Sequence, residues 1–331
     1  MFTEELHATA KALVSPPRGI LAADESIPTM SARLEKAGVP VSEENRRAYR
    51  QMLITTPDLD SGISGVILSD ETFNQKLDDG QPFPLAVHAR GILPGIKVDK
   101  GAKPLAFSPG EKVTEGLDGL RERLKDYVSR GARFAKWRAV IVIGDGLPTR
   151  RALRANAHAL GRYAALCQEA CVVPIVEPEV LMDGDHTIER CAEVTRATLE
   201  HVFAELDEAG VDVAGTVLKP NMVVPGTASG QHASPEEVAE YTVKTLRAVL
   251  PDTLAGVAFL SGGQSPEEAT ANLAAMQKHA TPWPLTFSFG RALVDPALKA
   301  WHGDPELVAA GQKALYDRVR PNSEAVARRA A

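Results

Sequence analysis

The stretch GTVLKPNMV, residues 215–223, joins a short apolar strand to a lysine and is closed at once by proline and asparagine. Val and Leu favour a buried strand, and the Pro-Asn pair ends it. Lys219 is therefore expected at the end of a buried strand, where lost hydration and any neighbouring cation lower the pKa of an ammonium group. A neutral amine is a nucleophile toward carbonyl carbon. The alternative is that Lys219 extends along apolar walls to solvent.

The same order of residues, an apolar run that closes on polar or charged side chains, recurs along the chain. The expected strands are residues 20–23, 65–68, 95–96, 134–135, 172–176, 217–218, 256–260 and 285–287. Between them, residues 155–169, 188–208 and 238–249 carry apolar side chains at the three and four spacing of helices. Ser234 and Ser265 each precede a proline and two glutamates, which is the pattern of a helix start.

Alternating strands and helices, eight times over, predict a (β/α)8 TIM barrel. We expect one domain over residues 1–331, with an extra helix at residues 1–14 and another at 305–319. Residues 321–323, Pro-Asn-Ser, should break the last helix, leaving residues 321–331 flexible or packed on the fold. A doubly wound sheet is the alternative, because spacing along the chain does not show whether the sheet closes.

Composition excludes several classes of protein. The 331 residues are 44% hydrophobic with a net charge of -6, so no basic surface for nucleic acid is expected. Three cysteines without a CxxC pair predict a reduced, cytoplasmic protein. There is no signal-peptide pattern, and no apolar run is long enough to span a membrane. The eight histidines form no i, i+4 pair, which argues against a His-based metal site.

In a closed barrel, the carboxyl ends of the strands meet at one mouth, where active sites of this fold lie. The residues expected there are Asp24, Lys97, Lys136, Glu177, Glu179, Lys219 and Ser261. Each charge alone is also consistent with a solvated loop residue. Gathered in one concave site, the lysines and carboxylates would shift each other's pKa values, with a Lys136 cation lowering the pKa of Lys219.

Two glycine-rich turns follow the last two expected strands. Ser261-Gly262-Gly263-Gln264 and Gly290-Arg291 stand where backbone N–H groups often bind phosphate in this fold, although both could be ordinary turns. A nucleophilic lysine, carboxylates for proton transfer and a phosphate site together indicate an enzyme that forms an imine with a phosphorylated ketose. The imine accepts the electron pair of the adjacent C–C bond, so cleavage leaves an enamine.

At these residues the chain resembles the class I fructose-1,6-bisphosphate aldolases over nearly its whole length. The matching stretches, in order, are GILAADES (19–26), SEENRRAYRQML (42–53), GIKVDKG (95–101), GLDGLRER (116–123), FAKWR (134–138), PIVEPE (174–179), GTVLKPNMV (215–223), FLSGGQS (259–265) and LTFSFGRAL (285–293).

The resemblance implies roles for individual residues. Lys219 would form the Schiff base, Glu177 would assist carbinolamine dehydration and take the C4 hydroxyl proton, and Asp24 would be a partner in that transfer. Lys136 would support imine formation and transition-state charge, with Glu179 hydrogen-bonded nearby. The C1 phosphate would meet Ser261, Gly262, Gly263, Ser288, Gly290 and Arg291. The distal phosphate would meet Lys97, Ser26 and Thr29, with Arg33 and Arg138 lining the site.

The resemblance also implies reversible cleavage of fructose 1,6-bisphosphate to dihydroxyacetone phosphate and glyceraldehyde 3-phosphate, in glycolysis and gluconeogenesis. It implies no metal, no other cofactor, a cytoplasmic location, a small-molecule phosphosugar substrate and a homotetramer, with neither nucleic acid nor membrane as a partner. Two alternatives remain open on sequence: a phosphosugar-binding or scaffold protein without turnover, and a Schiff-base barrel aldolase acting on a monophosphate or keto acid.

The chain departs from the family pattern at three places. Thr29 stands where many members carry serine, and Phe289 where many carry tyrosine. The chain ends in Arg-Arg-Ala-Ala at residues 328–331, without the tyrosine-ended tail of animal members. Such a tail is implicated in protonating the enamine at C3, so we expect another group or a bound water to perform that transfer here.

Overall fold

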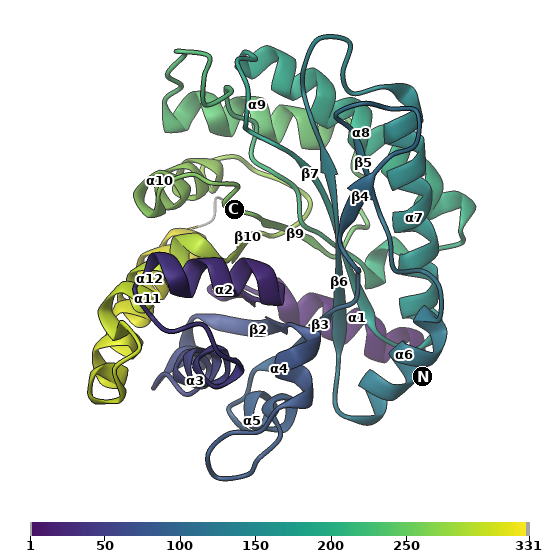
Figure 1. The fold of residues 1–331 in the computed structure, drawn as a ribbon. Coiled ribbons are helices and arrows are strands. Elements are labelled where there is room, and N and C mark those ends of the chain that lie inside the picture. The colour runs from purple at the N-terminus through teal and green to yellow at the C-terminus, as the bar shows by residue number, and fades with distance from the viewer. Residues whose placement is uncertain (1, 329–331) are drawn as a thin grey trace.

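The computed structural model describes residues 2–328, and its centre is a closed barrel of parallel strands in the order β1-β10-β9-β8-β7-β6-β3-β2 (Figure 1). The strands are β1 (Gly19–Ala23), β2 (Ile63–Leu68), β3 (Leu93–Lys97), β6 (Phe134–Ile141), β7 (Val173–Val180), β8 (Val217–Leu218), β9 (Gly256–Phe259) and β10 (Leu285–Phe289). Because β1 pairs with both β10 and β2, the sheet has no open edge. The predicted TIM barrel is confirmed, and a doubly wound sheet is excluded.

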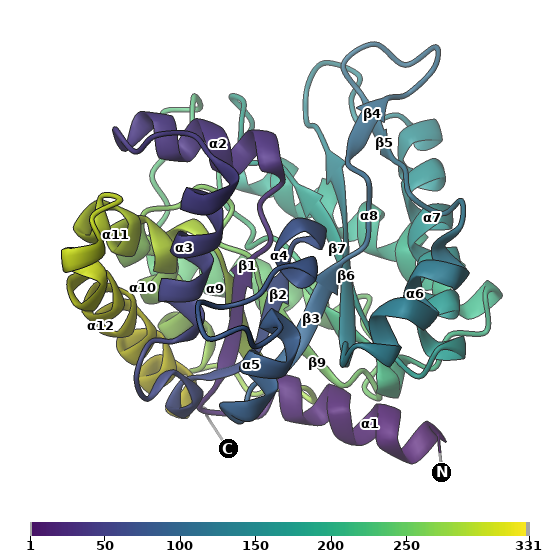
Figure 2. The same cartoon turned by 60° about the horizontal axis from the view of Figure 1, so that its bottom comes forward.

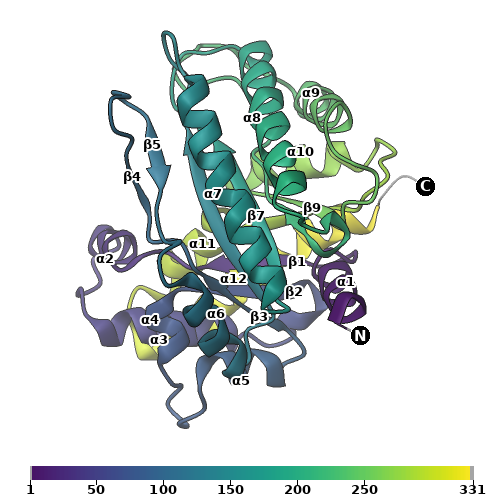
Figure 3. The same cartoon turned by 90° about the vertical axis from the view of Figure 1, so that its right-hand side faces the viewer.

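Helices surround the barrel, as the alternating pattern predicted. They are α1 (Phe2–Leu13), α2 (Ile27–Lys36), α3 (Glu43–Ile54), α4 (Asp70–Asn74), α5 (Phe83–Ala89), α6 (Leu120–Ser129), α7 (Arg150–Glu169), α8 (Ile188–Glu208), α9 (Pro235–Arg247), α10 (Pro266–Met276), α11 (Arg291–Trp301) and α12 (Val308–Ala327). Ser234 and Ser265 each cap their helix in a reciprocal capping box, so both expected helix starts are confirmed. The long helices α7 and α8 run side by side (Figure 3).

The apolar core has two parts, one inside the barrel and one between the barrel and its helices. The inner part contains Ile20, Phe134, Ile175 and Val217 from the strands, together with Leu6 of α1. Helix α1 closes that end of the barrel, opposite to α2 and the hairpin of β4 (Ala102–Pro104) and β5 (Lys112–Thr114) (Figure 2). The sequence patterns did not predict the hairpin.

Several strands run further than the sequence suggested, β6 and β7 most of all. We expected β6 to end at residue 135 and β7 at residue 176, but β6 continues to Ile141 and β7 to Val180. The reason is the two-residue period of a strand, which sends alternate side chains into the barrel. Lys136 follows Phe134 on the inward face, and Glu177 follows Ile175. These charged residues therefore belong to the strands instead of ending them.

The expected break at residue 321 is also wrong, because α12 passes through Pro321 and continues to Ala327. Proline inside a helix removes a hydrogen bond and typically costs about 3 kcal/mol. The neighbouring contacts offset this cost. Asn322 is fully buried, donates to the Arg318 carbonyl oxygen at 2.7 Å and accepts from the Thr270 hydroxyl at 3.0 Å. Ala325 and Val326 are buried as well, so this face of α12 packs against the fold. Residues 329–331 lie outside the described part of the chain.

Among residues 2–328, no helix combines the length and the apolar character that crossing a bilayer requires.

Candidate active site

A cavity of about 500 Å³ opens at the carboxyl ends of the strands, where the sequence placed the site. It is lined by every predicted site residue except Gly263, namely Asp24, Ser26, Thr29, Arg33, Lys97, Lys136, Arg138, Glu177, Glu179, Lys219, Ser261, Gly262, Ser288, Gly290 and Arg291. Gly263 stands beside them in the loop after Gly262. Residues from seven strands and from α2 thus meet in one place.

Four charged side chains form the floor of the cavity. Lys136 Nζ lies 2.7 Å from Asp24 Oδ2 and 3.1 Å from Glu177 Oε2, and Lys219 Nζ lies 3.3 Å from Glu177 Oε1. Asp24 and Lys219 directly follow β1 and β8, while Lys136 and Glu177 project from β6 and β7. All four are buried, with Lys219 only 3% exposed. The reading in which Lys219 reaches solvent at the surface is therefore excluded.

The charge states of this group follow from burial and from the neighbouring charges. Burial alone would raise the pKa of Asp24, but the neighbouring Lys136, and to a lesser extent Lys219, outweigh it and lower that pKa to about 2. In Glu177, burial is again outweighed by Lys136, Lys219 and Arg138, so its pKa is lowered. Burial would lower the pKa of Lys136, yet Asp24 and Glu177 raise it well above its usual range. Both carboxylates are ionised and Lys136 is a cation at neutral pH.

Two further ion pairs stand above this floor. Arg138 Nε donates to Glu179 Oε2 at 2.5 Å, joining β6 to β7. Lys97 Nζ lies 2.8 Å from Asp99 Oδ1, and the other oxygen of Asp99 accepts from the Arg138 backbone N–H at 3.1 Å. Asp99 thus fixes both Lys97 and β6. Sequence reasoning gave Asp99 no role, although it lies within the quoted stretch at residues 95–101.

The loop after β9 and the end of β10 line the cavity. Gly262 and Gly263 have φ values of 60° and 92°, a left-handed conformation that favours glycine. Gln264 Nε2 donates to the Ser261 carbonyl oxygen at 2.9 Å and holds the loop. The Ser288 hydroxyl is buried and has no hydrogen-bond partner among the described residues. An unpartnered buried hydroxyl next to such a loop is suited to an anionic ligand.

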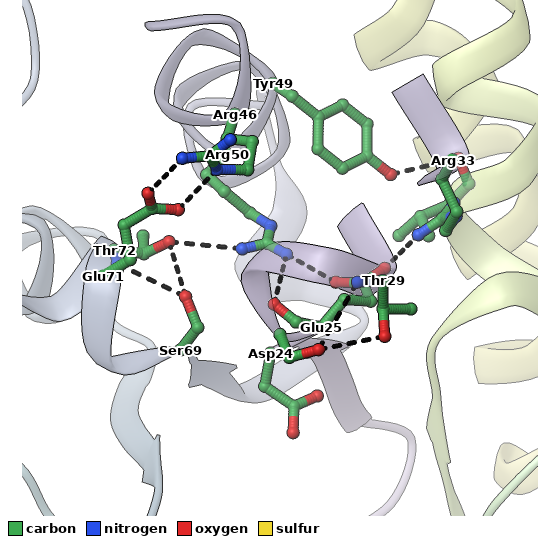
Figure 4. Close-up of polar contacts among 12 residues, drawn as sticks. Asp24, Glu25, Thr29, Arg33, Arg46, Tyr49, Arg50, Ser69, Glu71 and Thr72 are labelled. Carbon is green, nitrogen blue, oxygen red and sulfur yellow. Dashed lines mark hydrogen bonds and ion pairs between the residues drawn. The ribbon is translucent and has the colours of Figure 1, made fainter. Parts of the chain in front are cut away.

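Helix α2 brings a second set of polar groups to the cavity. Ser26 caps α2, and its hydroxyl lies 3.0 Å from that of Thr29. Arg33 follows Thr29 by one helical turn. The carboxylate of Glu25, which the sequence patterns did not single out, lies between Arg33 and the buried Arg50 (Figure 4). Glu25 could have been suspected only from its position between Asp24 and the capping serine.

The arrangement is suited to amine chemistry on a phosphorylated carbonyl compound. Lys219 is buried and faces the Glu177 carboxylate, which can exchange protons with it. The Lys136 cation lies beside them, and the same cavity contains groups suited to bind anions. Among residues 2–328, no three His, Cys, Asp or Glu side chains are grouped so that they could hold a metal ion.

Comparison with known proteins gives the same family from sequence and from structure. A family model described as fructose-bisphosphate aldolase class-I matches residues 5–330. A probable fructose-bisphosphate aldolase class 1 of Xanthomonas campestris pv. campestris is 54% identical over 97% of each chain. The cytoplasmic isozyme of Spinacia oleracea is 51% identical over 98% of this chain and 91% of its own.

A solved structure of fructose-bisphosphate aldolase from Plasmodium falciparum, in complex with TRAP and a small-molecule inhibitor, superimposes with a TM-score of 0.97 at 46% identity. The match covers 100% of this chain and 96% of that one. Since the family model spans almost the entire sequence and the relatives align along nearly their whole length, the chain belongs to the class I fructose-bisphosphate aldolase family.

Proposed function

We propose that Lys219 is the residue on which this enzyme builds its Schiff base. The enzyme is a class I aldolase that reversibly cleaves fructose 1,6-bisphosphate to dihydroxyacetone phosphate and glyceraldehyde 3-phosphate. The observation that carries the assignment is the 3.3 Å separation of Lys219 Nζ and Glu177 Oε1 in a buried site. This pairing gives the amine a proton acceptor within reach, and attack on the C2 carbonyl then produces a carbinolamine.

Glu177 is the proton carrier of the next two steps in this proposal. It first protonates the departing hydroxyl as the carbinolamine loses water. It then takes the proton of the C4 hydroxyl, while the C3–C4 electron pair moves into the iminium and leaves an enamine. A general acid/base group must be ionised and protonated in turn, and the Lys136 cation, 3.1 Å from Glu177 Oε2, stabilises the ionised form. Asp24, which binds the same cation, assists the transfer.

The flanking anion sites orient the two ends of the sugar. In this proposal the C1 phosphate lies against the loop at Ser261 and the Ser288 hydroxyl, and the distal phosphate lies between Lys97 and the start of α2 at Ser26. Binding both ends holds C2 against Lys219, and such positioning contributes much of the rate in two-substrate chemistry. Protonation of the enamine at C3 is assigned to a bound water or to another group in the cavity.

Borohydride trapping tests the central assignment. Reduction in the presence of dihydroxyacetone phosphate should leave a stable secondary amine on Lys219, identified by peptide mass spectrometry. Omitting the ketose is the control, and labelling at another lysine or at none would remove the assignment. Incubation with a chelator should leave the cleavage rate unchanged, whereas loss of activity that zinc restores would indicate metal-dependent chemistry.

The setting of the enzyme is part of the same proposal. The relative from Spinacia oleracea is named a cytoplasmic isozyme and one from Arabidopsis thaliana is named cytosolic, which supports a cytoplasmic location for this chain. We expect the chain to act as a single barrel domain and to assemble into a homotetramer. Sedimentation equilibrium would measure the assembly.

A further inference from the structure

Arg33 lines the active-site cavity, yet its guanidinium already contacts two carboxylates. Its Nη1 atom pairs with Glu25 Oε1, and its Nη2 atom lies 2.6 Å from Asp295 Oδ1. The two carboxylates come from different parts of the fold, because Glu25 precedes α2 whereas Asp295 belongs to α11. The Arg33 side chain is only 14% exposed, and the two pairs occupy one N–H donor on each of its terminal nitrogens.

The two carboxylates are held with unequal firmness. Glu25 Oε2 accepts from Arg50 Nη2 at 2.6 Å, and the Arg50 side chain is 1% exposed. Arg50 also donates to the Thr72 hydroxyl at 3.2 Å, so Glu25 is fixed from behind (Figure 4). The Asp295 side chain is 53% exposed, and among residues 2–328 its one ion-pair partner is Arg33. Asp295 can therefore swing into solvent while Glu25 keeps its place.

Arg33 is also positioned to reach an anion in the cavity. It stands one helical turn beyond Thr29, so both side chains lie on the same face of α2. Ser26, which caps α2, faces that same group, and all three residues line the cavity together with Lys97. A phosphate that approaches this group meets an arginine whose outer nitrogen is occupied by the displaceable Asp295. Arginine binds phosphate and carboxylate in the same forked geometry, so the two anions compete.

We propose that Asp295 is a specificity-determining residue that competes with the distal phosphate of the substrate for Arg33. The inference rests on the proposed function, because it takes a sugar bisphosphate as the ligand. Asp295 weakens binding of substrates that carry a second phosphate and has no effect on sugars that lack one. The exchange replaces one ion pair by another, and Arg33 remains paired with Glu25 throughout.

The variant Asp295→Asn removes the competing charge and keeps the shape of the side chain. An exposed ion pair of this kind contributes up to about 1 kcal/mol, so KM for fructose 1,6-bisphosphate should fall about two- to fivefold with kcat unchanged. The parameters for fructose 1-phosphate should stay within error of the wild type. Binding of a hexitol 1,6-bisphosphate, which has no carbonyl group and cannot form an imine, should tighten by the same factor in calorimetry.

Asp317→Asn is the matched control, since it removes an equally charged side chain from α12, where Asp317 pairs with Lys313. It should change none of these values. Asp295→Ser, a second neutral substitution, should repeat the effect of Asp295→Asn. An unchanged or increased KM, an equal change for both sugars, or the same change in the control overturns the proposal. Failure of the wild-type protein to cleave fructose 1,6-bisphosphate would instead overturn the proposed function.

Discussion

Lys136 Nζ lies 2.7 Å from Asp24 Oδ2, and both side chains are almost entirely removed from water. Their strands, β6 and β1, are not neighbours in the barrel, so the ion pair crosses its interior. A pair buried in this way is stabilising only while both partners stay charged, because an unpaired buried ion is strongly destabilising. The charge state of the cavity floor is therefore tied to the stability of the barrel, and both can be measured.

Lys219→Arg should abolish cleavage, because a guanidinium remains protonated and forms no imine. Its positive charge still faces Glu177, so the fold and the affinity for a hexitol bisphosphate should be retained. Measurable turnover in the variant, assayed by coupled triose phosphate formation, would show that another residue forms the Schiff base.

Glu177→Gln should keep substrate binding and lower kcat by about 100- to 10000-fold, the usual contribution of a general acid/base. The amide cannot exchange protons with the carbinolamine or with the C4 hydroxyl. Steady-state kinetics gives kcat, and calorimetry with the hexitol bisphosphate gives the affinity. A kcat within threefold of the wild type would remove Glu177 from the proton-transfer steps.

Asp24→Asn should reduce the free energy of unfolding only at pH values where the carboxylate is charged. Its pKa is about 2 in the folded protein against an ordinary 3.8, so the folded state favours the ionised form. This stabilisation is fully present above pH 3.8 and is lost as the pH falls toward 2. The difference between wild type and variant in urea unfolding should be about 2 kcal/mol at neutral pH and should shrink through that window. A difference independent of pH would contradict the ion pair.

Glu25→Gln should destabilise the fold, because Arg50 would remain buried without its counter-charge. Breaking a buried pair on one side typically costs about 3 to 5 kcal/mol. Adding Arg50→Met should recover a large part of that loss, since the double variant contains no unpaired ion. Denaturant unfolding of the two single variants and the double variant forms a closed cycle, and additive losses would show that Glu25 and Arg50 are not coupled.

Removal of residues 324–331 should change two rates by no more than about threefold: the exchange of the C3 proton of dihydroxyacetone phosphate and the cleavage of the hexose. Such a change is smaller than the ~10-fold that 1.36 kcal/mol of activation free energy produces. The melting temperature should fall, because Ala325 and Val326 are buried. The control is a deletion of residues 329–331 alone, which keeps the buried Ala325 and Val326. A hundredfold slower exchange in a folded variant would show that this end of the chain is catalytic.

The sequence was most informative where the local residue pattern alone determines the structure, as in buried strands and helix starts. Apolar runs located all the barrel strands, and Ser234 and Ser265 marked two helix starts correctly. The strand ends of β6 and β7 were misplaced because a charged residue was read as a stop signal. The two-residue alternation Phe134, Lys136, Arg138 would have shown that these side chains share the inward face.

What the sequence did not reveal are partners far apart along the chain. Arg50 and Asp295 meet Glu25 and Arg33 only after the barrel has closed, and no local pattern connects residues 33 and 295. The continuation of α12 through Pro321 was missed for the same reason. Asn322, which helps to hold the helix there, accepts a hydrogen bond from Thr270, 52 residues away in the sequence. Helix propensity gives the free-energy cost of a proline inside a helix, but only the folded structure shows the contacts that offset it.

The position of α1 determines the route by which substrate enters and products leave the cavity. Because the apolar side chains of α1 and the inner strand residues fill one end of the barrel, the cavity at the other end is a dead end and not a tunnel. Both products of cleavage must therefore leave through the same cavity opening by which the hexose entered. If Lys219 forms the Schiff base, as proposed, the ketose half is held at the buried end of the cavity, and we expect the free aldehyde to leave first. In the reverse direction the same proposal predicts that the ketose binds before the aldehyde, because a cavity closed at one end gives the deeper position to the first substrate that enters.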